Sequence, residues 1–161
     1  MSNSAHEAHV IASRATLDDL DALATLFDGY RVFYKQPSSP ALARAFIEER
    51  LQRDESVIFI ARDDGTREAF GFTQLYPMFS SVSARRIWVL NDLFVIPAAR
   101  KRGVARALMD CARDFAMEAG ALRLILETAE DNHAAQALYE SLGYVRESGE
   151  RHYALELGEK R

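Results

Sequence analysis

A run of basic residues surrounds one glycine, between a stretch that predicts a buried strand and one that predicts an amphipathic helix. The first turn of a helix offers unpaired backbone N–H groups and the positive end of the helix dipole, so it favours an anion. Gly103 lets the backbone approach that anion, and Ala105 keeps the next turn small. We predict a pyrophosphate cradle, with a solvated basic turn as the alternative. Its residues are Arg100, Lys101, Arg102, Gly103, Val104, Ala105 and Arg106.

This run matches neither of the two common glycine patterns of nucleotide enzymes. It is not the GxGxxG fingerprint of dinucleotide-binding folds, and it is not a GxxxxGKS/T phosphate loop. Dinucleotide and nucleoside triphosphate enzymes are therefore disfavoured.

A carboxylate, Asp92, follows Asn91 inside the apolar run Ile87–Ile96. An unpaired carboxylate in such a run costs several kcal/mol, so Asp92 must be solvated by a cleft, hydrogen-bonded or functional. A structural role, in which backbone N–H groups at a β-bulge satisfy the carboxylate, stays equally open. Glu127 ends the next alternating stretch, which starts at Leu122, and can face the same cleft as Asp92.

Asn132 and Tyr139 stand seven positions apart in a stretch that predicts a helix. Seven residues are close to two helical turns, so both side chains lie on the same face. Asn132 also suits the N-cap of that helix. Both residues can face the predicted cleft, although a core tyrosine with a satisfied hydroxyl is the more common role for a lone Tyr on a helix.

Two helices and a hairpin are predicted to precede these groups, and a strand–helix–strand–helix–strand order to contain them. Helices are expected from Thr16, from Pro40, over Arg102–Ala119 and over Asn132–Leu142. Strands are expected at Val10–Arg14, Val57–Ala61, Ala69–Leu75, Arg86–Ile96, Leu122–Glu127 and Arg151–Leu157. This order favours an α/β fold with a mixed sheet, helices on both faces and one parallel crossover.

The 161 residues suffice for one domain, which we place at 10–161, with 1–9 as a disordered N-terminal end. A formal net charge of −4 disfavours a nucleic-acid partner. No apolar run is long enough to cross a membrane and no secretory signal is evident, so we expect a soluble, cytoplasmic protein. The four histidines lack metal-ligand spacing, and Cys111 falls on an apolar helix face, so we predict no metal and an inert thiol.

The two motifs together resemble the GNAT superfamily of N-acetyltransferases, most strongly from Val89 to Tyr144. The phosphate-binding pattern Gln/Arg-x-x-Gly-x-Gly/Ala is met by the six residues from Arg100 to Ala105. The later pattern, an Asn seven residues before a Tyr in a helix that ends in Leu-Gly-Tyr, is met by Asn132, Tyr139 and Leu142–Tyr144. The stretches Gln74–Val82 and Trp88–Val95 resemble the branch of histone and polyamine acetyltransferases.

The resemblance implies a mostly antiparallel sheet of six to seven strands and acetyl-CoA as the cosubstrate. Acetyl-CoA would be held by backbone groups of Leu93, Phe94 and Val95 and by the loop Arg102–Arg106. Asn132 would lie beside the pantetheine or the thioester. A backbone N–H near Phe94 or Val95 would polarise the thioester carbonyl. A homodimer is also implied.

The implied reaction is direct acetyl transfer to a primary amine, either a polyamine, a lysine-like amine or another small amine. Tyr139 occupies the position of the general acid that protonates the thiolate. The base is open, because polyamine acetyltransferases of this superfamily carry a Glu-Asp pair where this chain has Asn91 and Asp92. We favour Asp92 for amine binding and proton removal, with Glu127, a bridging water or an already neutral amine as alternatives. A coenzyme A-binding module without turnover is the rival hypothesis.

Overall fold

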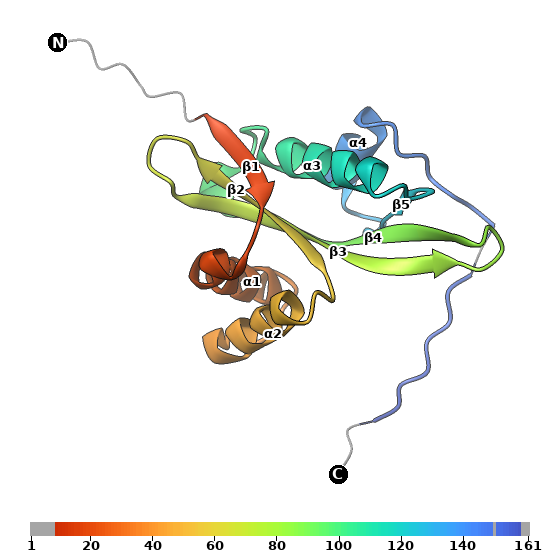
Figure 1. Cartoon of the computed structure of the whole chain (residues 1–161), viewed down its shortest axis with the longest axis horizontal. Coiled ribbons are helices and arrows are strands. Elements are labelled where there is room, and N and C mark those ends of the chain that lie inside the picture. The colour runs from red at the N-terminus through yellow and green to blue at the C-terminus, as the bar shows by residue number, and fades with distance from the viewer. Residues whose placement is uncertain (1–8, 150, 159–161) are drawn as a thin grey trace. The chain divides into compact units, whose positions relative to one another are not determined.

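The computed structural model describes residues 9–149 and 151–158. These fall into two compact units, one up to Glu127 and one from Thr128 onward. Two short 3₁₀ turns, Leu17–Asp19 and Pro97–Ala99, accompany the longer elements. In order these are β1 (Val10–Arg14), α1 (Leu20–Phe33), α2 (Pro40–Gln52), β2 (Val57–Asp63), β3 (Ala69–Ser80), β4 (Arg85–Val95), α3 (Val104–Glu118), β5 (Leu124–Ile125) and α4 (His133–Ser141) (Figure 1).

The first unit contains one sheet, in the order β1-β2-β3-β4-β5. Neighbouring strands are antiparallel except β4 and β5, which pair in parallel at Trp88 with Leu124 and at Val89 with Ile125. The mixed, mostly antiparallel sheet with one parallel crossover is therefore confirmed.

The expectation of six to seven strands was wrong, because the described residues form a five-stranded sheet. Residues 151–157 have the alternating pattern of a strand but belong to no strand of the sheet that the described residues form, and Tyr153 is 89% exposed. The strand expected over Leu122–Glu127 is reduced to β5, which pairs with β4 only up to Val89. Two residues further on, β4 carries a bulge, and a bulge bends a strand away from its neighbour.

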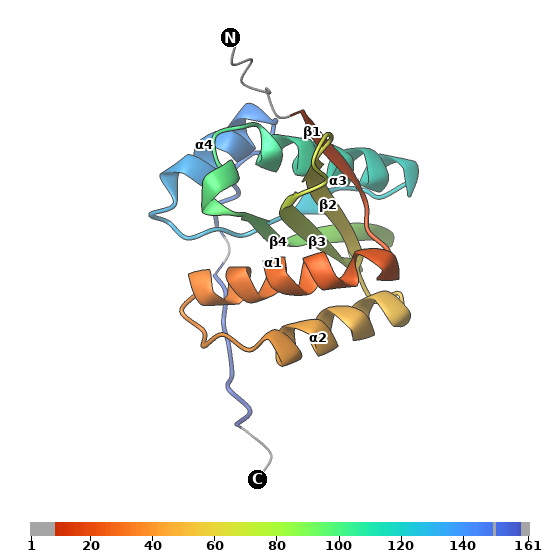
Figure 2. The ribbon, with the colours of Figure 1, turned by 90° about the vertical axis from the view of Figure 1, so that its left-hand side faces the viewer.

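Helices cover both faces of this sheet. The paired helices α1 and α2 lie on one face, and α3 lies on the other (Figure 2). The core under α1 and α2 joins Leu23, Phe27 and Ile47 to Ile60, Phe72 and Phe94 of the sheet. α3 presents Val104, Leu108, Met109, Ala112 and Ala116 as its buried face. The layered arrangement agrees with the helix spacing of the apolar residues.

Local signals set the helix starts. Thr16 and Asp19 form a capping box ahead of α1, and α2 begins at Pro40, where a missing N–H costs nothing. α3 begins after Gly103, whose φ of +76° suits glycine. In the second unit, Gly143 at φ +91° follows the end of α4.

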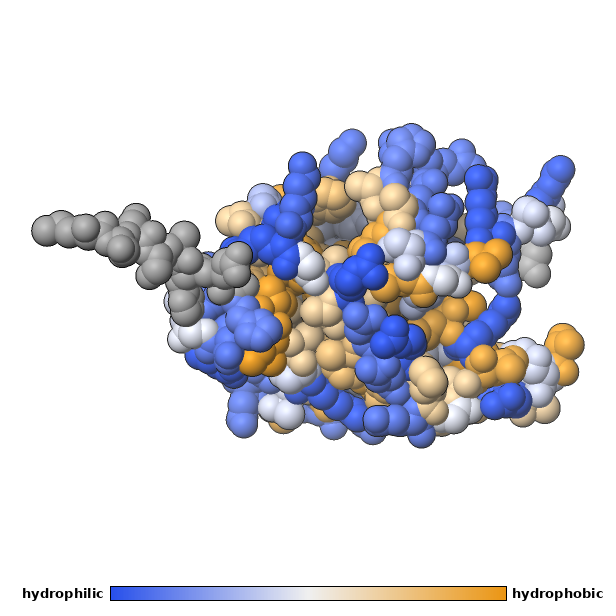
Figure 3. Space-filling view, turned by 90° about the horizontal axis from the view of Figure 1, so that it is seen from above, coloured by the Kyte–Doolittle hydropathy of each residue, from blue (hydrophilic) through white to orange (hydrophobic). Residues whose placement is uncertain are grey.

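Seen from above, the described residues mix long hydrophilic side chains with smaller hydrophobic areas across the visible face (Figure 3). No helix among residues 9–149 and 151–158 combines the length and the apolar composition needed to cross a membrane. The expected disordered end, 1–9, lies outside the described residues apart from His9.

Candidate active site

The register between β3 and β4 slips by one residue in the middle of the sheet. Gln74 pairs with Asp92 and Leu75 pairs with Leu90, so Asn91 is the extra residue of a bulge. β4 has β5 beside it only at Trp88 and Val89, so the rest of that edge, which includes Leu93 to Val95, has no strand next to it among the described residues. An open edge of this kind can accept an extended ligand through backbone hydrogen bonds.

At that edge, the groups available to a ligand are the backbone groups of Leu93, Phe94 and Val95 rather than their side chains. The Phe94 side chain is only 8% exposed and belongs to the core under α1 and α2. The Val95 carbonyl accepts a hydrogen bond from Arg100 Nε at 3.3 Å. The expected use of backbone groups is compatible with this arrangement.

The predicted anion site lies one short turn beyond this edge, at the start of α3. Gly103 is the N-cap, and a Cβ added at this glycine would meet no atom within 4 Å. The next residue, Val104, is buried. Arg102 stacks over the Phe70 ring, 4.8 Å from its centroid, and Arg100 lies 5.7 Å from the Phe33 ring. Lys101, Arg102 and Arg106 are exposed, and Ala105 is half-buried in the first turn. Open backbone N–H groups and exposed cations in one place can hold a pyrophosphate.

Asp92 is buried in the sheet, at 3% exposure, and its carboxylate is hydrogen-bonded by side chains. Gln74 Nε2 donates to Oδ2 at 2.5 Å, and Asn91 Nδ2 donates to Oδ1 at 3.0 Å. The Tyr30 hydroxyl, which comes from α1, also interacts with this carboxylate. The structural alternative from the sequence assumed backbone donors at a bulge, whereas the two donors shown are side chains.

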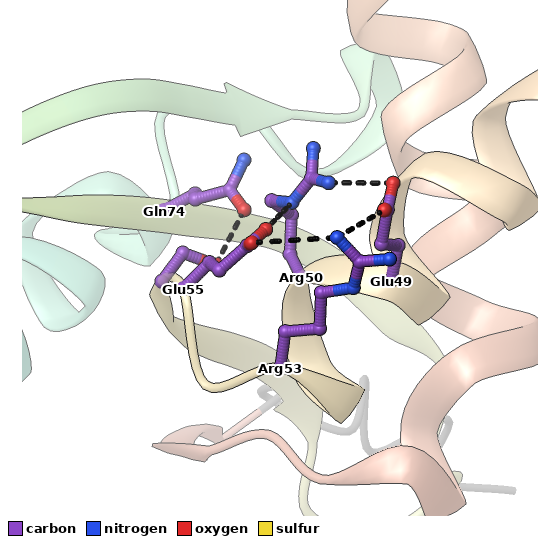
Figure 4. Close-up of polar contacts among 6 residues, drawn as sticks. Glu49, Arg50, Arg53, Glu55 and Gln74 are labelled. Atoms are coloured by element: carbon purple, nitrogen blue, oxygen red, sulfur yellow. Dashed lines mark hydrogen bonds and ion pairs between the residues drawn. The ribbon is translucent and has the colours of Figure 1, made fainter.

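Asp92, Asn91, Gln74 and Tyr30 form a polar patch. This polar patch continues from Gln74 along β3 toward the end of α2. Ser56 Oγ donates to Gln74 Oε1 at 2.8 Å, and the Tyr76 hydroxyl interacts with Gln74. Beside them, Arg50 lies between Glu49 at 2.6 Å and Glu55 at 2.7 Å, and Arg53 contacts the same two carboxylates (Figure 4).

Two tyrosines in this patch hold their protons more tightly than usual. Burial, and after it the charge of Asp92, raises the pKa of Tyr76 to about 12, and Arg50 opposes that shift. Burial is also the main cause that raises the pKa of Tyr30, followed by the interactions of its hydroxyl with the Asp92 carboxylate. Both phenols are neutral donors at physiological pH.

Glu127 lies two residues beyond β5 and is exposed. It is therefore outside the strand in which the alternation placed it, because the strand ends at Ile125. That Glu127 and Asp92 face one cleft stays a prediction.

The second unit carries the two helical residues of the later motif. Asn132 caps α4, with its Oδ1 accepting from the Ala135 N–H at 3.3 Å. Tyr139 is half-buried, and its ring lies 6.2 Å from that of Tyr144. The predicted cap is confirmed, and the functional roles of Asn132 and Tyr139 stay predictions.

Cys111 is not suited to nucleophilic chemistry. Its thiol points to the Ala12 carbonyl at 3.6 Å, and burial, followed by the charges of Asp114 and Asp110, raises its pKa. Within the part of the chain that the structure describes, no group of three or more His, Cys, Asp or Glu side chains is placed to hold a metal ion.

The bulge, the open edge of β4 and the glycine-started α3 occur in a chain that matches the family model described as "Acetyltransferase (GNAT) family" over residues 21–144. The chain belongs to the GNAT acetyltransferase family. This N-acetyltransferase is 48% identical over 147 residues to "Uncharacterized N-acetyltransferase YhfO" of Bacillus subtilis (strain 168), a match that covers 91% of this chain and 97% of the relative.

Two solved structures resemble this GNAT acetyltransferase over almost its whole length. A crystal structure of a probable acetyltransferase is 43% identical, with a TM-score of 0.87, and the match covers 93% of this chain and 99% of that one. The structure of AAC(6')-Iy in complex with the bisubstrate analog CoA-S-monomethyl-acetylneamine is 25% identical, with a TM-score of 0.74, over 92% and 99% of the two chains. The family uses acetyl-CoA as the acetyl donor.

Sequence reasoning did not find Tyr30, Ser56 or Arg50, and it used Gln74 only as part of a resemblance. One signal was available for Gln74, since Phe72, Gln74 and Tyr76 alternate on one face of β3 and continue the core face into polar residues.

Proposed function

We propose that this GNAT acetyltransferase transfers the acetyl group of acetyl-CoA directly to a primary amine of a small molecule or a lysine-like side chain. The observation that carries the proposal is the open edge of β4 at Leu93–Val95, which leads through one short turn into the glycine-started α3. An extended ligand with an anionic end needs these two features in this order.

Acetyl-CoA supplies an activated thioester, and the residues described above fit its chemistry. Backbone groups of Leu93, Phe94 and Val95 would pair with the extended part of the molecule. Residues 100–106 would hold its pyrophosphate, because cations and the backbone N–H groups of the first turn of α3 meet there. Asn132 would contact the pantetheine or the thioester.

The proposed chemistry has three parts that this chain must provide. A backbone N–H near Phe94 or Val95 stabilises the oxyanion that develops on the thioester carbonyl. The amine must lose a proton before it attacks, and Asp92 or Glu127 would receive that proton through a water. Tyr139 would give its proton to the leaving thiolate.

The acceptor is proposed to be cationic in its resting form, because Asp92 brings a negative charge to the polar patch, in which Arg50 and Arg53 balance Glu49 and Glu55. Polyamines and lysine-like amines meet this requirement. The homodimer implied by the family resemblance and the cytoplasmic location expected from the sequence stay predictions.

A thiol-release assay with acetyl-CoA and a panel of acceptors tests the proposal. The panel contains a polyamine, an Nα-blocked lysine, an aminoglycoside and an α-amino acid, each paired with its N-acetylated form as the control. We expect thiol release with at least one free amine, together with a product that gains one acetyl group by mass spectrometry. Acetyl-CoA binding without release for any amine would instead support a coenzyme A-binding module.

A further inference from the structure

The Gln74 side-chain amide links Ser56 to the Asp92 carboxylate and is hydrogen-bonded at both its oxygen and its nitrogen. Ser56 Oγ donates to Gln74 Oε1, so the amide nitrogen is the end that faces Asp92. Gln74 is 0% exposed and Ser56 is 5% exposed, so water does not compete for either contact. The pair of hydrogen bonds therefore holds the carboxylate in one position.

The same carboxylate is tied to the bulge of β4. Asn91 is the extra residue, and its Nδ2 donates to Asp92 Oδ1 at 3.0 Å. From the opposite strand, Thr73 Oγ1 donates to the Asp92 main-chain carbonyl at 2.8 Å. The position of Asp92 thus determines how the backbone leaves the ladder at Asn91, immediately before the open edge that begins at Leu93.

Tyr30 brings a further polar group, its hydroxyl, to Asp92 from the opposite layer. Its ring lies 5.9 Å from Phe72, 6.5 Å from Phe94 and 4.9 Å from Tyr34, so aromatic packing fixes the place of its hydroxyl. The hydroxyl interacts with Asp92 across the interface between α1 and the sheet. The raised pKa of Tyr30 keeps this group a donor.

A carboxylate so buried, with two side-chain donors and an interaction with the Tyr30 hydroxyl, is poorly placed to collect a proton from an incoming amine. We propose that Tyr30 and Gln74 are positioning residues that hold Asp92, and through it the Asn91 bulge, in the geometry that acetyl transfer requires. This inference rests on the proposed function and deepens it. Asp92 then acts on the backbone edge that receives acetyl-CoA, and proton removal falls to Glu127 or to water.

The alternative is a polar network that only stabilises the fold. The two roles separate in a double-mutant cycle of Tyr30→Phe, Asp92→Asn and the combined variant. Tyr30→Phe removes the hydroxyl and keeps the ring packing. Tyr34→Phe, at an exposed ring on the C-cap residue of the same helix, is the matched control.

For Tyr30→Phe we expect kcat to fall about 10- to 100-fold through misplacement of the reacting groups, with a nearly unchanged melting temperature. The dissociation constant of acetyl-CoA rises as well, because the edge that binds it is displaced. In the Asp92→Asn background, Tyr30→Phe has little further effect on either quantity.

Three results would overturn the inference. One is a change in melting temperature without a change in kcat or in acetyl-CoA affinity. Another is an effect of Tyr30→Phe that is the same with and without Asp92. The third is a loss of rate in Asp92→Asn with intact acetyl-CoA affinity, which would identify Asp92 as the base.

Gln74→Leu tests the second positioning residue, and it is read alongside Tyr30→Phe because the buried substitution can lower stability. If the unchanged protein acetylates none of the amines, the proposed function fails. The inference is then tested by acetyl-CoA affinity alone. Non-additive weakening across the cycle supports it, and additive or absent weakening refutes it.

Discussion

Gln74 Nε2 lies 2.5 Å from Asp92 Oδ2, at the last residue pair before the register of β3 and β4 slips. One step earlier along the same face, the equivalent pair is Phe72 with Phe94, both buried in the core. The sheet therefore changes from an apolar to a polar face within one step, at the position where β4 bends. The bulge and the buried carboxylate form one structural feature.

Tyr139→Phe tests the general acid. Protonation of a leaving group contributes about 100-fold or more to such reactions, so we expect kcat to fall by that order. Acetyl-CoA affinity should stay within about twofold, since the ring remains and only the hydroxyl is lost. Steady-state kinetics and calorimetric titration with acetyl-CoA measure the two quantities.

Tyr153→Phe is the control for this experiment, because Tyr153 lies in the same unit and is 89% exposed. It should behave as the unchanged protein. An unaltered kcat in Tyr139→Phe, or a parallel loss of affinity, would remove the acid role.

Arg102→Ala tests the anion site at the start of α3. Arg102 stacks over the buried Phe70 ring, which orders its guanidinium beside Gly103. One charged contact to a phosphate contributes about 1 kcal/mol near a protein surface, so the dissociation constant of acetyl-CoA should rise about fivefold at low salt. The difference should shrink as the ionic strength increases.

Arg113→Ala is the matched control, since Arg113 lies on α3 and pairs with Asp110 and Asp114. Its removal should leave acetyl-CoA affinity unchanged. If both variants weaken binding equally, the effect comes from net charge, and the site is elsewhere.

Features that depend on neighbours in sequence were predictable. The glycine before α3, the proline at the start of α2 and the Asn132 cap each follow from the conformation or hydrogen bond that one residue supplies. The interruption of an apolar run by Asp92 also indicated a special position.

Features that depend on register were not predictable. Gln74 and Asp92 are 18 residues apart, and their contact requires the strand pairing on one side of the bulge. Tyr30 reaches Asp92 only because α1 packs on that face. Alternation in residues 151–157 indicated which side chains share a face, but it contains no information on a partner strand.

The raised pKa of Tyr76 predicts that the folded protein loses stability at alkaline pH. Its pKa is raised from 10.0 to about 12, so the folded state holds this proton more tightly than the unfolded state. Its contribution is complete below pH 10 and is lost as the pH rises to about 12. Phenolate absorbance should show a late phase in the native protein that is absent in denaturant.

Tyr76→Phe should remove part of this late phase and flatten the fall of unfolding free energy over the same pH range. Tyr34→Phe, which removes an exposed phenol, should change neither. A native titration curve that Tyr76→Phe leaves unaltered in its late phase would contradict the assignment.

Gly71 allows β3 and β4 to approach where the open edge ends. A Cβ at this residue would lie 2.4 Å from the Phe94 carbonyl oxygen, which is a backbone atom and cannot rotate away as a side chain can. Gly71→Ala should therefore lower the free energy of unfolding by about 1–3 kcal/mol, as overpacking does. It should also weaken acetyl-CoA binding, because the strand that moves carries Leu93–Val95.

Gly120→Ala is the control for Gly71→Ala. A Cβ at Gly120 meets nothing within 4 Å, so this substitution strains only a turn and should leave acetyl-CoA binding intact. Denaturant unfolding and calorimetry measure both effects, and equal binding losses in the two variants would show that Gly71 has no special relation to the β4 edge.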